Sequence, residues 1–186
     1  MKFITGIPYP LGVLLLFCLI SGCAGSMSDI TVPISMERLS GTILEQSRAT
    51  RIEVVDLRRG STMRRTVFNV SLGAITLSPP EAELVKELIA DALQRVSGEL
   101  GPPTIYCGIR TFDIVTPATP LYWDVTTRIE LILRTRGHER TVSTEAVERT
   151  WIYPAAEIIR RVTTRALRDL SVAMEKELSS LLATPP

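Results

Sequence analysis

Histidine and cysteine are scarce in this sequence, which has one histidine and three cysteines among 186 residues. Catalytic groupings that need a histidine would depend on His138, which falls in a predicted hairpin turn and is poorly placed for a shaped pocket. The usual zinc sites need several histidine or cysteine ligands, which one chain of this composition cannot supply. The sequence also lacks a glycine-rich phosphate loop of P-loop or Rossmann spacing. We therefore predict that the protein is not an enzyme and holds neither a metal nor another cofactor.

An excess of charge of either sign is also missing. The 21 basic and 20 acidic residues give a formal net charge of +1 at pH 7. Lys2 is the only charged residue before Cys23, so a chain that starts at Cys23 would have 20 basic and 20 acidic residues. Such a protein has no global electrostatic attraction to nucleic acid, and we predict no nucleic acid partner.

The apolar run over residues 11–20 is too short to span a bilayer, which takes about 20 apolar residues. It follows Lys2 and precedes small residues, which is typical of a secretory signal peptide. The segment Ile20-Ser21-Gly22-Cys23 comes directly after it and resembles the bacterial lipobox, in which an aliphatic and two small residues precede a cysteine. An ordinary secretory signal with a coincidental cysteine is the alternative interpretation.

The lipobox resemblance implies a diacylglycerol group on the Cys23 sulfur, cleavage before Cys23 and acylation of the new amino terminus. By the same resemblance, Ala24 in place of an aspartate implies sorting to the outer membrane. We therefore predict a signal peptide over residues 1–22, a lipid anchor and tether over 23–50, and one domain over 51–183 that faces the periplasm.

After cleavage, Cys23 would be blocked by lipid and Cys107 would have no intramolecular disulfide partner. Cys107 lies in an apolar, strand-like run over residues 106–109. We predict a buried structural thiol at this position. A reactive cysteine, or one that pairs with another molecule, is the alternative.

The apolar pattern predicts five strands, over residues 51–57, 66–77, 104–115, 123–134 and from a turn at 136–139 to about 150, with a further short strand near Ile43 in the tether. Ser78-Pro79-Pro80-Glu81 has the pattern of a capping box with proline at the first helical position, and Pro154 opens a second long amphipathic helix. This order favours an α+β two-layer sandwich, in which a largely antiparallel sheet of about five strands has both helices on one face.

Arginines cluster in two predicted loops, residues 58–65 and the hairpin tip near residue 137. If the loops lie at the same end of the sheet, they would form a patch for phosphate-bearing lipid headgroups or an acidic partner. Solvated arginines balanced by nearby acids are the alternative interpretation. The candidate residues are Arg58, Arg59, Arg64, Arg65, Arg134, Arg136 and Arg140.

The chain resembles the YajG-type lipoproteins in its lipobox, in the strand end Val54-Val55-Asp56-Leu57-Arg58, in the helix entry Leu77-Ser78-Pro79, in the strand start Trp123-Asp124 and in its closing amphipathic helix. Over residues 50–182 its outline is also similar to the lipoprotein that partners the lipopolysaccharide translocon and to auxiliary lipoproteins of lipid-transport ABC systems. The resemblance implies an envelope accessory role without known catalytic residues, and Cys23 is the one site that it carries over.

Three functions follow from these features. The first is a non-enzymatic accessory or adaptor in outer-membrane assembly or maintenance, tethered through acyl chains on Cys23 and bound to an envelope protein. The second is a lipid- or glycolipid-binding auxiliary component of an envelope transport system, which needs an apolar cavity between helices and sheet. The third and least favoured is an envelope hydrolase that uses His138.

Overall fold

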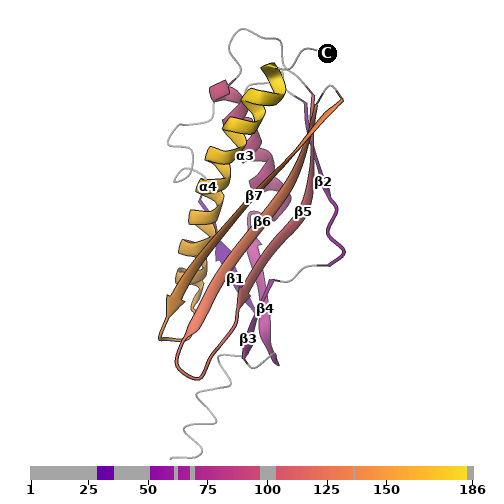
Figure 1. The fold of residues 1–186 in the computed structure, drawn as a ribbon. Helices are drawn as coiled ribbons and strands as arrows, with labels where there is room; N and C mark the ends of the chain where they lie inside the picture. Colours follow the sequence, from indigo (N-terminus) through magenta and orange to yellow (C-terminus); the bar gives the residue numbers. More distant parts are fainter. Residues whose placement is uncertain are drawn as a thin grey trace, which may run out of the picture.

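The computed structural model describes residues 29–35, 51–60, 63–67, 70–96, 104–135 and 137–183. In these ranges the chain forms, in order, β1, β2, β3, β4, α3, β5, β6, β7 and α4. Figure 1 shows both helices on the same face of one twisted sheet. The predicted α+β fold with two layers is confirmed.

A long antiparallel meander forms one half of the sheet. It consists of β5 (Ile105–Thr116), β6 (Trp123–Thr135) and β7 (His138–Thr150). The alternation predicted for β6 is present, because Val125, Ile129 and Leu131 are buried beneath the helices while Arg128 on the opposite face is exposed. This half of the sheet agrees with the sequence pattern almost residue for residue.

The other half of the sheet makes it mixed, with seven described strands in place of about five. β2 (Ile52–Asp56) and β3 (Met63–Val67) both run parallel to β5 along its second edge, beside residues 105–109 and 114–116 respectively. β4 (Val70–Ser78) is antiparallel to β3, and α3 (Glu81–Val96) then carries the chain across to β5. A helical crossover of this kind permits parallel pairing, and for this reason the sheet is less antiparallel than predicted.

The stretch predicted as one strand over residues 66–77 is in fact split between β3 and β4. Arg64 and Arg65, predicted in a loop, belong to β3. The pairing register shifts between Arg65 and Thr66, opposite Gly73, whose φ of 147° favours glycine. Strand side chains alternate with a period of two residues, and a connection of two residues leaves this alternation unbroken. The sequence pattern therefore gave no sign that the stretch is divided into two strands.

Part of the predicted tether belongs to the sheet. β1 (Ile30–Pro33) pairs in parallel with β4, and Val32 and Ile34 are buried. A strand of four residues is too short to establish a period in the sequence. Ile43, where a short strand was predicted, and Cys23 lie outside the described residues.

The two helices are α3 (Glu81–Val96) and α4 (Ala156–Ala183). Helix α3 begins two residues later than predicted because Ser78 ends β4, where its carbonyl accepts a hydrogen bond from the Ile34 N–H. The N–H groups of Glu83 and Leu84 donate to the Pro80 carbonyl at 3.0 Å. The Glu81 carboxylate accepts a hydrogen bond from Arg58, so Glu81 serves a tertiary contact instead of the predicted capping box.

Candidate functional site

The structure does not bring the two predicted arginine groups together. Arg64 is in register with Val115 of β5, whereas Arg134 is in register with Tyr106. Residues 106 and 115 are nine positions apart, which corresponds to roughly 30 Å along a strand. The two groups therefore lie towards opposite ends of the sheet.

Several of these arginines hold the fold together. The Arg58 side chain is 12% exposed and forms ion pairs with Asp56 and Glu81, at 2.7 and 3.3 Å. Arg65 is buried, with its guanidinium 5.2 Å from the ring centre of Tyr153. These two guanidiniums serve contacts within the domain, so they are poor candidates for ligand binding.

The remaining members of the predicted patch are dispersed. Arg134 donates to Glu139 at 2.5 Å, and Arg140 lies 3.9 Å from Glu177 of α4. Arg59 and Arg64 are exposed on the β2–β3 side of the sheet, and Arg136 lies outside the described residues. Solvated arginines, the alternative interpretation, describe these positions better than a single anionic site does.

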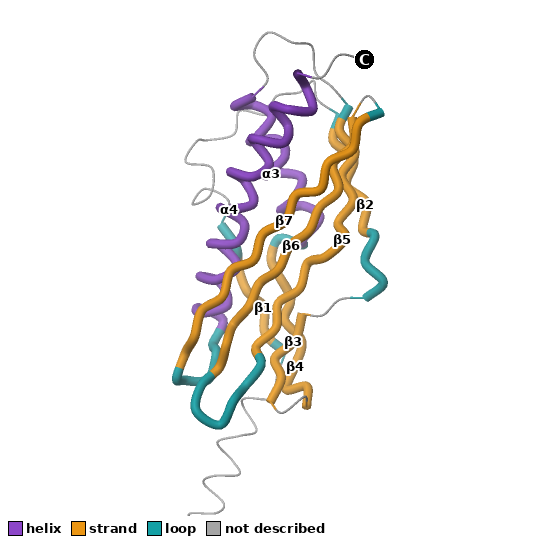
Figure 2. The backbone as a smooth tube through the Cα atoms, in the orientation of Figure 1, coloured by secondary structure: helices purple, strands orange, loops and turns teal. Residues whose placement is uncertain are grey.

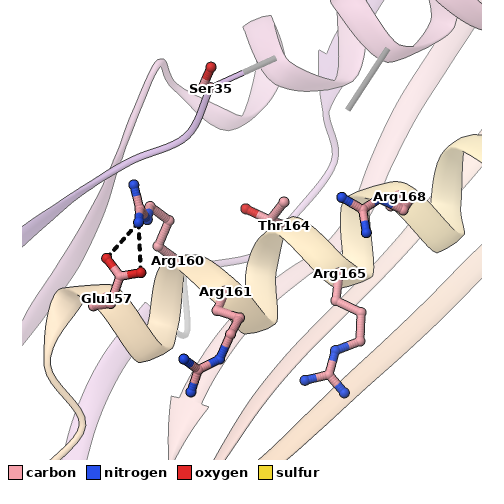
Figure 3. Close-up of a pocket in the computed structure, with 7 residues that line it drawn as sticks. All are labelled: Ser35, Glu157, Arg160, Arg161, Thr164, Arg165 and Arg168. Atoms are coloured by element: carbon pink, nitrogen blue, oxygen red, sulfur yellow. Dashed lines mark hydrogen bonds and ion pairs between the residues drawn. The ribbon is translucent and has the colours of Figure 1, made fainter. Parts of the chain in front are cut away.

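Arginines gather instead on the first half of α4 (Figure 3). They line a pocket of about 470 Å³ between this helix and the segment that follows β1. Four of the seven lining residues are arginines and one is a glutamate. The lining residues are Ser35, Glu157, Arg160, Arg161, Thr164, Arg165 and Arg168.

Helical spacing divides these side chains between two sides of α4. Arg160 and Thr164 lie on the side nearer Ser35, while Arg161 and Arg165 point away from it (Figure 3). The second pair meets Glu148 of β7, which accepts from Arg161 Nε at 3.1 Å and from Arg165 Nη2 at 2.9 Å.

The hydrogen bond from Arg161 holds the pKa of the Glu148 carboxyl below its usual value, because it stabilises the charged form. The same hydrogen bond raises the pKa of Arg161. Glu148 therefore stays ionised and keeps both arginines fixed between helix and sheet.

The pocket keeps a surplus of positive charge. Glu157 accepts from Arg160 through both carboxylate oxygens, at 2.6 Å. The four arginines of the pocket are therefore balanced by only two carboxylates, those of Glu157 and Glu148. Within the described ranges, Arg168 has no ion pair. Guanidinium groups present a planar fork of donors that fits carboxylates and phosphates, so the donors that line this pocket suit an anionic group.

This pocket was missed in the sequence, although part of its signal is visible there. Arg161, Arg165 and Arg168 recur at spacings of four and three, which places them on neighbouring parts of one helix surface. The apolar stripe of the same helix is the stronger periodic signal, and these arginines lie outside it. The contribution of Ser35 could not be foreseen, because it depends on β1 joining the sheet.

Cys107 is buried, as predicted, with 1% of its surface exposed, and burial raises its pKa to about 12. We expect the native mature protein to react with a thiol-specific dye only after unfolding, because the thiolate is the reactive form and the thiol is enclosed. The measurement compares dye uptake in buffer and in denaturant. Fast uptake by the folded protein would contradict a structural role for Cys107.

His138 begins β7 beside the turn residue Gly137, as expected for a hairpin tip. In the part of the chain that the structure describes, no group of three histidine, cysteine, aspartate or glutamate residues could hold a metal ion. Neither described helix is long and apolar enough to cross a membrane.

No protein family model matches this chain, and no curated protein matches its sequence. Among solved structures, an uncharacterized protein has 12% identity and a TM-score of 0.44, covering 82% of this chain and 98% of its own. A putative lipoprotein from Caulobacter crescentus CB15 has 15% identity and a TM-score of 0.39, covering 56% and 84%. The Protein Y N-terminal domain from Thermus thermophilus has 11% identity and a TM-score of 0.31, covering 66% and 99%.

Proposed function

We propose that the protein is a lipid-anchored adaptor of the bacterial envelope, held at the outer membrane through Cys23. In this proposal the α4 pocket of the protein binds acidic side chains of a protein partner. The observation that carries the proposal is the surplus of arginine in the pocket between α4 and Ser35. The anchor rests on the lipobox sequence Ile20-Ser21-Gly22-Cys23.

The arginines of the pocket are preorganised for such a partner. Glu148 and Glu157 hold Arg161, Arg165 and Arg160 in place, so these side chains lose little freedom when a ligand arrives. A guanidinium has five N–H donors, and the internal ion pairs use only some of them. Incoming carboxylates can therefore add to the existing network, and Arg168 can take one on its own.

The alternative role in lipid transport needs a dry channel for acyl chains between helices and sheet. Several of the largest side chains in this space are fully buried. Phe112, Ile129 and Leu167 have no accessible surface, so no water-sized space borders them. The α4 pocket itself is lined by charged and hydroxyl side chains, which suit an anionic group rather than a hydrocarbon chain.

Charge reversal in the pocket tests the adaptor role. The double variant Arg160→Glu/Arg168→Glu should bind a fluorescent oligoglutamate peptide at least about tenfold more weakly than the parent, since hydrogen bonds to charged groups contribute roughly 1.5–3 kcal/mol each. Fluorescence anisotropy at low and high salt measures both the affinity and its screening.

Arg59→Glu is the matched control for each charge reversal, because Arg59 is exposed and lies outside the pocket. We expect it to bind the peptide like the parent. Equal affinity of the parent and the double variant would sink the proposal. Tight binding of lipopolysaccharide micelles, with none of the peptide, would favour the transport role.

A further inference from the structure

Three large apolar side chains project from one end of the domain. Leu121, Trp151 and Ile152 are 75%, 72% and 67% exposed. They come from two loops, residues 117–122 between β5 and β6 and residues 151–155 between β7 and α4, which lie at the same end of the molecule (Figure 2). We call these two loops the apolar tip.

The two loops of the apolar tip touch each other, and each has hydrogen bonds of its own. The rings of Tyr122 and Trp151 pack edge to face with centres 5.7 Å apart. In the first loop the N–H groups of Leu121 and Tyr122 donate to Thr119 Oγ1, at 3.3 and 3.0 Å. In the second, the Ile152 N–H donates to the hydroxyl of Thr150 at 3.3 Å. The apolar side chains are therefore held outward by hydrogen-bonded loops.

Charge distinguishes the two ends of the domain. Residues 117–122 and 151–155 include no charged residue and no histidine, although 22% of the whole chain is charged. At the opposite end, the hairpin between β6 and β7 brings together Arg134, His138, Glu139 and Arg140. The nearest charges are those of Arg149, which lies 3.8 Å from the ring centre of Tyr122, and of its ion-pair partner Asp124. Of the two ends compared, the apolar tip is therefore the one whose loops could enter a layer of low polarity without dehydrating charges of their own.

The apolar tip lies at the end of the sheet where β1 begins. The pairing registers place the start of β1 level with the end of β5. Ile30 of β1 is opposite Ile75 of β4. The neighbouring Ala74 is opposite Arg64 of β3, and Arg64 is opposite Val115 near the end of β5. β5 runs towards the apolar tip, and the pairing directions make β1 run away from it. β1 therefore begins at the end of the sheet that carries the apolar tip.

The distance to the anchor is limited by the covalent chain. Six residue steps separate Cys23 from Asp29, and a fully extended chain of this length spans at most about 20 Å. An acylated Cys23 would hold the membrane surface within that reach of Asp29, the residue before β1. The end of the domain nearest to the bilayer is then the end with exposed leucine, isoleucine and tryptophan.

We propose that the apolar tip inserts into the interfacial layer of the membrane that anchors the protein. Tryptophan and tyrosine are enriched at this depth, where the ring is surrounded by acyl chains and its polar edge is hydrated. Leu121 and Ile152 would enter beside Trp151, while the α4 pocket and the charged hairpin stay in water. This inference rests on the lipid anchor of the proposed function, and it adds a fixed orientation of the domain on the membrane.

Tryptophan fluorescence tests the insertion directly, because the chain has only two tryptophans, Trp123 and Trp151. The mature acylated protein is reconstituted into vesicles of phosphatidylcholine and phosphatidylglycerol, with or without brominated acyl chains. In the variant Trp123→Phe we expect the emission of Trp151 to shift to shorter wavelength and to be quenched by the brominated lipid.

A tryptophan at the far end of the domain is the control. In the background Trp123→Phe/Trp151→Phe, the further change His138→Trp should give emission that brominated lipid leaves unchanged.

A second readout keeps both natural tryptophans. Leu121→Cys is labelled with a nitroxide, which should be more accessible to oxygen dissolved in the bilayer than to a water-soluble nickel complex.

Flotation of the same samples separates the anchor from the apolar tip. Protein that floats with the vesicles, but whose Trp151 is quenched no more than the His138→Trp reporter, would overturn insertion while the anchor stands. Protein that does not float would overturn the anchor and insertion together. A dimer in detergent that dissociates on Trp151→Ser would assign the apolar tip to a second copy of the chain and also overturn insertion.

Discussion

The variant Cys23→Ser is expected to accumulate as a precursor that is 22 residues longer than the mature protein and carries no acyl chain. The lipobox chemistry attaches diacylglycerol to the sulfur before cleavage, and a serine hydroxyl is a much weaker nucleophile than a thiolate. Intact mass and metabolic labelling with a fatty acid measure both changes. Two or more acyl chains give stable anchoring, so the parent should remain with the membrane after a salt wash.

Cys107→Ser is the matched control, because it removes the other cysteine of the mature chain and leaves the lipobox intact. It should be cleaved, acylated and membrane-bound like the parent. Globomycin, which blocks the lipoprotein signal peptidase, should also leave a longer form of the parent, still with its diacylglycerol. A parent protein recovered in the soluble fraction with an unmodified amino terminus would contradict the location, the adaptor role and the insertion of the apolar tip.

The parts of the fold that could be predicted are those with a long uninterrupted period. β6 alternates over 13 residues and α4 keeps an apolar stripe over 28, so each buried face is marked many times along the sequence. β1 has four residues, and the connection between β3 and β4 preserves the alternation, so neither leaves a local mark. Parallel pairing of β2 and β3 with β5 is a property of partners distant in the sequence.

The candidate site was harder to predict than the fold, for a related reason. A charged residue shows its type in the sequence but not its partner. Arg58 and Arg65 belong to a basic sequence cluster, yet one pairs with Glu81 and the other covers Tyr153. Arg168 is equally basic and lines the α4 pocket. The tertiary contacts of each arginine determine whether it stabilises the fold or is available to bind a ligand.

Replacement of Arg58 by alanine should destabilise the domain by about 2 kcal/mol, because it breaks a contact among three elements. Arg58 pairs with Asp56 at the end of β2 and with Glu81 at the start of α3, and it donates to the Phe112 carbonyl of β5 at 3.4 Å. Without it, the carboxylate of Glu81, whose side chain is 15% exposed, loses its ion pair. Breaking a fully buried pair costs 3–5 kcal/mol, and partial hydration of Glu81 reduces the estimate to about 2 kcal/mol.

Urea denaturation at pH 7 measures the difference in the free energy of unfolding. Arg59→Ala is the matched control, since Arg59 is its exposed neighbour, and it should change the free energy of unfolding by no more than about 0.5 kcal/mol. Equal losses from Arg58→Ala and Arg59→Ala would show that net charge, rather than the contact among β2, α3 and β5, is what matters.

The effect of Arg58 should also depend on pH, in a direction set by Asp56. The hydrogen bond from Arg58 holds the pKa of the Asp56 carboxyl below its ordinary value of 3.8. A carboxyl with a lowered pKa in the folded state stabilises the fold above its unfolded pKa, and this contribution is lost as the pH falls through the folded pKa. The stability difference between parent and Arg58→Ala should therefore be full near pH 7 and shrink below about pH 4. Asp56 is half exposed, so water screens this pair, and the contact to Glu81 should account for most of the loss at pH 7.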